Sequence, residues 1–497
     1  MRESPAELSA EEFRVVGHRL VDQIADFIDT IGSRPVAPSL APRDVRALVG
    51  ADAVVPESGR GATGMLEDMA RVLFANSTLN GHPRFFGYIT SSAAPIGALA
   101  DLLATSVNPN CGAWGLSPVA TEIEKQVVRW VAELIGFSPK AGGLLVSGGN
   151  VANMVCLIAA IRAKAAWDVR ANGVANQKRL IVYASSEVHT WLQKGADICG
   201  LGIDSFHSVD VDSVGAMRID SLRDRIVEDR KNGLQPAVVI GTAGSVSTGA
   251  IDPLRAIADL CANESLWFHV DGAYGAPAAM LDDAHPDFRA IASADSVATD
   301  PHKWLYAPLE AGTALVRDAN ALHTAFSFHP PYYTFDGAAE DPPTNFHEWG
   351  PQNSRGFRAL KVWATIKQIG RDGYKRMIGE DIALSREMYR LASESTALEA
   401  VTQSLSIATF RYVPERLRDD RHEPVNLEYL NRLNTELLAR LQRDGRVYLS
   451  NAVIGKIFAL RACIVNFRTG PDDVQTAIEE SIRLGRQIDS DFGGPAS

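Results

Sequence analysis

The sequence lacks several features that mark whole classes of protein. It contains no run of eighteen consecutive apolar residues, so we expect no transmembrane helix and no membrane partner. Residues 1–20 have no apolar core of the signal-peptide type. The formal net charge of −11 argues against a surface built for the phosphates of nucleic acid.

Cysteine is also scarce. The chain has five cysteines, which are scattered and form no C-x-x-C pair. This pattern is typical of free thiols in a reducing compartment and gives no zinc signal. We therefore expect a cytoplasmic protein without a metal site.

The beginning of the chain predicts an amphipathic helix. Ser9 and Glu12 fit a capping box, and apolar residues then recur at steps of three and four as far as Ile31. Such a helix must bury its apolar stripe against the body of the protein or against a second chain. We predict an N-terminal helical segment at 1–79 that serves dimerisation.

After residue 80, short apolar runs alternate with helical windows. This alternation predicts a mostly parallel sheet covered on both faces, within a large domain at 80–375. A smaller α+β domain is expected at 376–497, with strands in 405–414 and 461–469. The runs that indicate strands of the large sheet are 179–185, 236–244, 266–272, 295–300 and 312–318.

Polar side chains follow the ends of these predicted strands. Thr242, Asp271 and Lys303 each stand at or just past a strand, and ligands gather at the carboxyl ends of such strands. Residues 147–150 (SGGN) open a buried helix whose first N–H groups could bind an anion. His189 follows another strand. Each feature alone also has an ordinary structural explanation, such as an exposed lysine, a capping aspartate or a glycine turn.

Together these groups match one ligand, pyridoxal phosphate (PLP). The amine of Lys303 would form a Schiff base with its aldehyde, and Asp271 would keep its pyridine nitrogen protonated. The glycine turn would bind its phosphate, and His189 would lie over its ring.

Two motifs carry a resemblance to a known family. HVDGAYGA at 269–276, followed by DPHKW at 300–304, closely resembles the group II PLP-dependent decarboxylases, above all the aromatic-L-amino-acid branch. The segments 82–88, 117–130, 147–154 and 354–363 look like further landmarks of that family in the same order. The resemblance implies fold type I, similar to aspartate aminotransferase, and a homodimer with its active site at the subunit interface.

The resemblance also implies roles for individual residues. Lys303, His189 and Tyr332 correspond to catalytic positions. The cofactor-binding positions are Lys303, Asp271, Ala273, His189, Thr242, Gly149, Asn150, His302 and Asp300, and the substrate-binding positions are Thr90, Ser91, Gly112 and Arg355.

The long segment at 326–352 resembles the mobile catalytic loop of the family, which closes over the neighbouring subunit's site. Tyr332, or the adjacent Tyr333, would protonate Cα after carbon dioxide leaves. A loop whose tyrosines only pack is the plainer alternative.

We expect decarboxylation of an aromatic L-amino acid to its amine. One alternative is an aldehyde synthase, which couples decarboxylation to oxidative deamination; Tyr332 argues against it, because family members with phenylalanine there tend toward aldehyde. A second is a decarboxylase of a non-aromatic amino acid such as glutamate, whose distal carboxylate would require a dedicated cation. A third is a non-catalytic dimer that keeps the fold.

Overall fold

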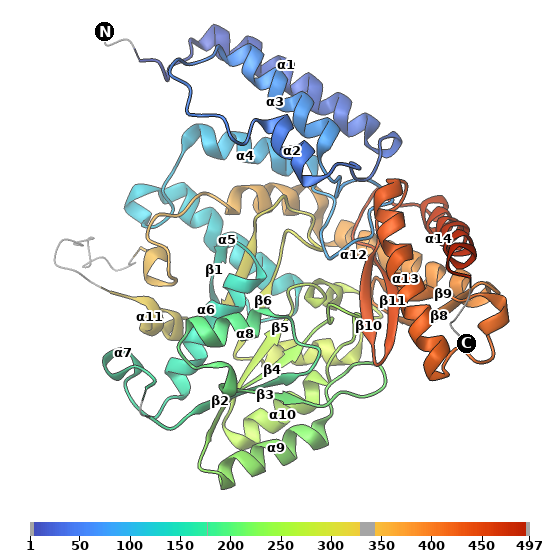
Figure 1. Ribbon diagram of the computed structural model, residues 1–497. Coiled ribbons are helices and arrows are strands. Elements are labelled where there is room, and N and C mark those ends of the chain that lie inside the picture. Colours follow the sequence, from blue (N-terminus) through green and yellow to red (C-terminus); the bar gives the residue numbers. More distant parts are fainter. Residues whose placement is uncertain (1–3, 176, 329–342, 494–497) are drawn as a thin grey trace.

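The computed structural model describes residues 4–175, 177–328 and 343–493. Figure 1 shows a layer of N-terminal helices, a large sheet between helices, and a smaller C-terminal sheet with helices of its own. Within the described ranges, no helix is both long and apolar enough to cross a membrane.

The N-terminal layer begins with the expected amphipathic helix, α1 (Ala10–Thr30). The backbone N–H of Glu12 donates to Ser9 Oγ, and the N–H of Ser9 donates to the Glu12 carboxylate, which confirms the capping box. The rings of Phe27 and Phe74 stack at 4.5 Å where α1 packs against α3. Val16 is the one fully buried residue of α1. Leu20, Ile24, Phe27 and Ile28 of its apolar stripe are half-buried, and Phe13 is exposed. The other helices of this layer are α2 (Pro42–Val49), α3 (Ala62–Asn76) and α4 (Pro95–Val107).

The central sheet has seven strands in the order β1-β7-β6-β5-β4-β2-β3. The strands from β6 to β3 are parallel, whereas β7 is antiparallel to both of its neighbours. The prediction of a mostly parallel sheet is confirmed, although β1 and β3 were not indicated by the sequence patterns. The strands are β1 (Gly142–Val146), β2 (Leu180–Ser185), β3 (Phe206–Val209), β4 (Gln235–Thr242), β5 (Trp267–Asp271), β6 (Ser296–Thr299) and β7 (Gly312–Val316).

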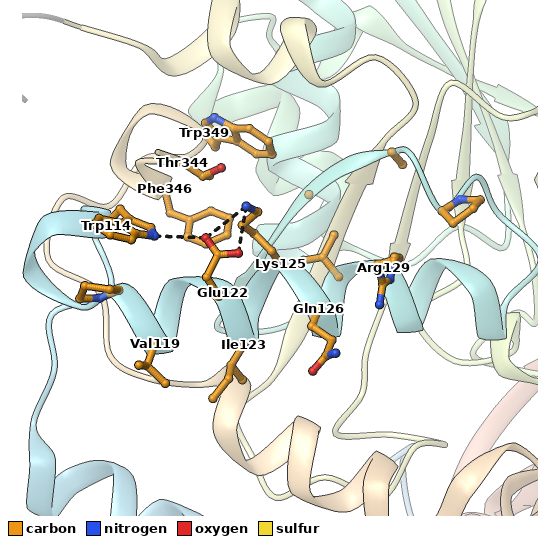
Figure 2. Close-up of a pocket in the computed structure, with 15 residues that line it drawn as sticks. Trp114, Val119, Glu122, Ile123, Lys125, Gln126, Arg129, Thr344, Phe346 and Trp349 are labelled. Atoms are coloured by element: carbon orange, nitrogen blue, oxygen red, sulfur yellow. Dashed lines mark hydrogen bonds and ion pairs between the residues drawn. The ribbon is translucent and has the colours of Figure 1, made fainter. Parts of the chain in front are cut away.

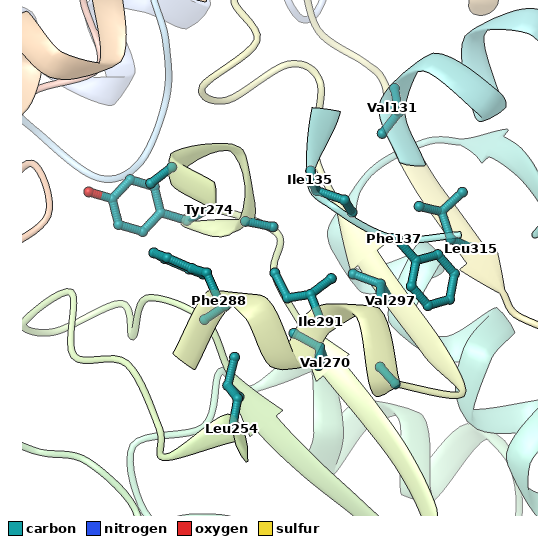
Figure 3. Close-up of a cluster of buried hydrophobic side chains, with 14 of the residues drawn as sticks. Val131, Ile135, Phe137, Leu254, Val270, Tyr274, Phe288, Ile291, Val297 and Leu315 are labelled. Carbon is teal, nitrogen blue, oxygen red and sulfur yellow. The ribbon is translucent and has the colours of Figure 1, made fainter. Parts of the chain in front are cut away.

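Helices cover both faces of this sheet, because successive strand residues point to opposite sides. Val297 and Leu315 belong to a core shared with α5, α9 and α10, part of which Figure 3 shows. Their neighbours Ala298 and Ala314 belong to a second core shared with α6, α8 and α11. The helices are α5 (Pro118–Leu134), α6 (Gly149–Lys164), α7 (Val169–Asn172), α8 (Trp191–Ile198), α9 (Ile219–Lys231), α10 (Leu254–Glu264) and α11 (Ala319–Phe326).

The long helix α12 (Ala359–Glu394) joins the large and small parts. It is kinked at Gly370, whose φ is 69°, and it packs against α4, α5, β8 and α14. The domain boundary predicted between residues 375 and 376 lies inside this helix.

The small part is an antiparallel sheet with the order β10-β11-β9-β8. The run at 405–414 contains β9, as expected. The strand predicted in 461–469 is wrong in its bounds, because the observed strand β11 ends at Cys463. The chain turns after Asn466, whose carbonyl accepts the N–H of Thr469. The elements are β8 (Leu398–Ser404), β9 (Ile407–Tyr412), α13 (Pro424–Asp444), β10 (Ser450–Ile454), β11 (Ile457–Cys463) and α14 (Pro471–Phe492).

Candidate active site

Three neighbouring parallel strands bring the predicted polar groups to one edge of the sheet. Thr242 at the end of β4 is paired in register with Asp271 at the end of β5. Asp271 is paired in turn with Ala298 of β6, five residues before Lys303. A cavity of about 370 Å³ opens at this edge, and all three polar residues line it.

Lys303 is held beside a buried carboxylate. Its backbone N–H donates to the carbonyl of Asp300 at 2.8 Å, which makes a tight turn after β6. Its Nζ lies 3.1 Å from Asp300 Oδ2, so the amine has a counter-ion inside the pocket. Asp300 Oδ2 also lies 3.7 Å from His302 Nε2, while Ala311 O is 2.7 Å from His302 Nδ1. Burial lowers the pKa of His302, which favours the neutral imidazole.

Asp271 is buried and receives two neutral donors. Trp191 Nε1 donates to its Oδ2 at 2.7 Å, and the N–H of Ala273 donates to its Oδ1 at 3.2 Å. No lysine, arginine or histidine nitrogen among the described residues lies within 4.0 Å of this carboxylate. Trp191 lines the cavity too. No sequence pattern predicted this, because a tryptophan two residues after a histidine is not typical of any known binding motif.

The glycine turn forms a cradle at the start of α6. Ser147, Gly148, Gly149 and Asn150 line the cavity, and the free N–H groups of the first helical turn lie at this end of α6. A Cβ on Gly149 would lie 2.7 Å from Asp300 Oδ2, so a larger residue would crowd the cradle. The close approach explains the glycine, and the N–H groups suit a phosphate.

His189 lies at the rim of the same cavity. Its Nδ1 accepts the N–H of Trp191 at 3.2 Å, which fixes the ring at the start of α8. Partial burial lowers the pKa of His189, and the nearby Asp271 carboxylate opposes that shift. The neutral imidazole of His189 is therefore favoured.

None of the four predicted substrate-binding residues lines the cofactor pocket itself, and one of them lines a neighbouring cavity. Ser91 Oγ donates to the carbonyl of His302 at 2.7 Å, and Ser91 lines a second, apolar cavity of about 400 Å³. The two cavities have His302 and Leu309 in common. Thr90 and Gly112 line neither of them, and Gly112 packs against the backbone of Asn353.

Arg355 also lies outside both cavities. Its guanidinium is buried against Glu124, with Nη2 at 2.5 Å from Oε1 and Nη1 at 3.1 Å from Oε2. It donates as well to the carbonyls of Cys111 and Leu145. Both terminal nitrogens of Arg355 are thus engaged within the chain, and its buried Nε has no hydrogen-bond partner among the described residues. Its predicted contact with substrate stays a prediction, as do those of Thr90 and Gly112.

The predicted proton donor is not placed, because Tyr332 and Tyr333 fall outside the described residues. A larger hollow of about 790 Å³ lies along α5, where Trp114 Nε1 donates to Glu122 Oε1 and Lys125 pairs with the same carboxylate (Figure 2). It has no lining residue in common with the cofactor pocket. The described part of the chain has no cluster of three or more side chains suited to a metal.

Comparisons with known proteins agree with this geometry. Residues 42–413 match the family model of the pyridoxal-dependent decarboxylase conserved domain. The chain is 31% identical over 483 residues to an aromatic-L-amino-acid decarboxylase of Bacillus atrophaeus, with 97% of each chain covered. It is 28% identical over 466 residues to a phenylacetaldehyde synthase of a Rosa hybrid cultivar, covering 92% of this chain and 90% of that one. The crystal structure of Oryza sativa TDC with PLP and tryptamine matches with a TM-score of 0.89 and 25% identity, covering 98% of this chain and 100% of that one.

The fold and the site define a PLP-dependent enzyme of fold type I. The chain belongs to the pyridoxal-dependent decarboxylase family, and it is a PLP-dependent carboxy-lyase. The pocket fits this cofactor, since it offers one amine, one buried carboxylate without a cationic partner, and a glycine cradle at a helix N-terminus.

Proposed function

We propose that this enzyme converts an aromatic L-amino acid into its amine and carbon dioxide. The observation that carries the proposal is the apolar cavity that adjoins the cofactor pocket at His302 and Leu309. Side chains of α1 and α3, among them Phe27, Ile28 and Phe74, line it, and such a wall suits a flat apolar ring. The full-length similarity to an aromatic-L-amino-acid decarboxylase supports the same substrate class.

Each residue of the pocket has its own role in this proposal. When bound, PLP joins the substrate's amino group to a ring that accepts the electrons of the bond broken at Cα. Lys303 Nζ is the amine that would hold the cofactor covalently when no substrate is bound. The Asp271 carboxylate holds a proton on the pyridine nitrogen, and the cradle at Gly149 binds the phosphate. His189, which lines the same cavity, would contact the ring of the cofactor.

Glutamate is the second candidate class, and one residue favours it. Arg468 lines the apolar cavity and forms no ion pair with any described residue, so its guanidinium could receive a distal carboxylate. The guanidinium of Arg468 lies over the ring of Phe467, with its central carbon 4.5 Å from the ring centroid. In the cofactor pocket, Lys303 is the one lysine or arginine among the described lining residues.

The active enzyme in this proposal is a homodimer with a shared active site. Leu99, Leu103 and Val107 on α4 are each more than half exposed, and so are Phe13 on α1 and Leu73 on α3. Exposed apolar residues gathered on neighbouring helices mark an interaction surface. A second copy would cover it and bring its own 326–352 segment, with Tyr332 as proton donor, toward this pocket.

Substrate and product are tested together. The purified holoenzyme is incubated with each of the twenty amino acids, and carbon dioxide, amine, aldehyde and oxygen uptake are measured. We expect carbon dioxide and amine in equal amounts from aromatic substrates. Release from glutamate alone, and its loss in Arg468→Met, would establish the acidic alternative. Aldehyde with oxygen uptake would establish the synthase.

The cofactor assignment has a direct optical test. The protein is expected to show a visible absorbance band with PLP that borohydride removes. Lys303→Ala should lack the band, whereas Lys194→Ala, at an exposed position on α8, should keep it. A protein that stays colourless with added PLP would support the non-catalytic dimer instead.

A further inference from the structure

The carboxylate of Asp271 is held by an indole. Trp191 is only 1% exposed, and its Nε1 lies 2.7 Å from Asp271 Oδ2, a short distance for a hydrogen bond to a carboxylate. The N–H of Ala273 reaches the other oxygen at 3.2 Å. Each carboxylate oxygen therefore has one protein donor and a lone pair left for a further donor in the cavity.

Packing on its far side keeps this indole in place. Trp191 meets the ring of His269 edge to face, with centroids 6.0 Å apart and an interplanar angle of 81°. His269 is itself fixed between Asn153 Oδ1 at 2.7 Å and Ser296 Oγ at 2.8 Å. Burial lowers the pKa of His269 to about 4, so this histidine is neutral at neutral pH and brings no positive charge to Asp271.

The indole is a neutral donor, and this decides what it can do. A lysine or arginine at 2.7 Å would neutralise Asp271 and compete with a cation in the pocket. An indole N–H fixes the direction of the carboxylate, but it brings no positive charge to it. The charge is then available to a protonated ring nitrogen.

We propose that Trp191 is a positioning residue, which aims the Asp271 carboxylate at the pyridine nitrogen of the cofactor. The inference rests on the role of Asp271 proposed above. Trp191 is the first residue of α8, and its backbone N–H donates to His189 Nδ1. The same residue therefore also fixes the imidazole of His189, which is expected to lie over the ring of the cofactor. Trp191 thus positions two groups that are expected to contact the cofactor, Asp271 through its side chain and His189 through its backbone.

The first test measures PLP affinity of the apoenzyme, by absorbance titration, in Trp191→Phe. The phenyl ring keeps most of the packing but cannot donate a hydrogen bond. We expect PLP binding to weaken on the order of tenfold, as for the loss of one hydrogen bond to a charged group. Trp363→Phe is the matched control, because it removes another indole donor to a side-chain oxygen, Gln126 Oε1 at 2.7 Å, on a residue of α12 that does not line the cofactor pocket. Equal losses in the two variants would overturn the proposal.

A double-mutant cycle separates this inference from the assignment beneath it. If Trp191 acts through Asp271, Trp191→Phe should weaken PLP binding in the wild-type background and have little further effect beside Asp271→Asn. If Asp271→Asn leaves PLP affinity unchanged, the proposed site itself is wrong. If Asp271→Asn weakens binding and Trp191→Phe does not, only the role of Trp191 is wrong.

A measurement without a tryptophan variant covers the case in which Trp191→Phe does not fold. The chain has eight tryptophans, and ¹⁵N labelling of their indoles gives one N–H resonance each. In the apoenzyme, Asp271→Asn should move one strongly downfield resonance, that of the indole bonded to the carboxylate. Should every downfield indole resonance keep its position, the hydrogen bond is absent in solution and the proposal fails.

Discussion

Arg355 and Glu124 form a buried, two-pronged ion pair, although they are 231 residues apart in the chain. The Glu124 Oε1 atom also accepts the N–H of Leu145 at the end of β1, at 2.8 Å. The backbone N–H of Cys111 donates to the carbonyl of Arg355 at 2.8 Å. The pair thus ties α5, β1 and the loop around Cys111 to the segment that leads into α12.

Removing one charge of this pair is expected to destabilise the protein strongly. Glu124→Gln would leave the guanidinium of Arg355 buried without a counter-charge and turn an amide N–H₂ toward it. We expect a loss of about 3–5 kcal/mol in the free energy of unfolding, measured in urea. Glu133→Gln on the same helix removes the partner of an exposed pair with Arg129 at 3.8 Å, and should cost less than about 1 kcal/mol.

Arg355→Lys decides between anchoring and substrate binding. Lysine keeps the charge but cannot make the two-pronged contact, so we expect lower stability and little selective change in KM. A variant of wild-type stability with a raised KM would instead support the substrate contact expected from the family resemblance.

Much of the fold followed from local patterns in the sequence. The runs that contain β2, β4, β5, β6 and β7 were recognisable because strands buried on both faces are short and almost wholly apolar. The groups at Thr242, Asp271 and Lys303 could be placed together because parallel strands end at one edge. The start of α1 was fixed by a hydrogen-bond pattern confined to four residues, Ser9 to Glu12.

The rest depends on contacts between distant residues. Nothing near Arg355 in the sequence indicates Glu124, and nothing near Asp271 indicates Trp191, 80 residues earlier. The end of β11 was misjudged for a similar reason. The apolar run continues through Val465, but Asn466 Nδ2 donates to the carbonyl of His82 at 2.8 Å, a partner in the segment before α4, and the chain leaves the sheet.

Gly149→Ala tests the cradle. The added methyl group would lie 2.7 Å from Asp300 Oδ2 and 3.2 Å from the Cβ of Ala273, so the glycine turn or these neighbours would have to shift and the cradle would change shape. We expect PLP binding to weaken roughly tenfold or more, measured by titrating the apoenzyme. Gly379→Ala is the control, because a methyl group on that helical glycine would have no atom within 4 Å and should add up to about 1 kcal/mol of stability. Unchanged PLP affinity in Gly149→Ala would place the phosphate elsewhere.

Leu103→Lys tests the shared active site. A charge on this exposed position of α4 should oppose burial against a second copy, so we expect sedimentation at micromolar concentration to show monomers with little activity. Val227→Lys, on an exposed position of α9, should leave a dimer of normal activity. A monomer that still turns over would contradict the idea that two chains complete one site.

Asp381 predicts a pH dependence of stability. Its Oδ2 accepts Trp304 Nε1 at 2.8 Å and the hydroxyl of Tyr306, so it ties the residues that follow Lys303 to α12. Burial raises the pKa of Asp381 from 3.8 to about 7, and these two donors only partly oppose the shift. The folded protein therefore keeps this proton at pH values where the unfolded chain has lost it. Its contribution to stability is complete below about pH 4 and is lost progressively as the pH rises to about 7.

Asp381→Asn should remove that dependence, because an amide does not titrate and its oxygen can still accept from both donors. We expect the stability of the wild type relative to this variant to be greater at about pH 4.5 than at about pH 8, measured by urea unfolding at both values. Asp282→Asn, an exposed position that pairs with Lys375, should give the same difference from wild type at the two pH values. A pH-independent effect of Asp381→Asn would mean that Asp381 is already ionised in the folded protein at the lower pH, and that the link between α12 and the lysine segment is a charged one.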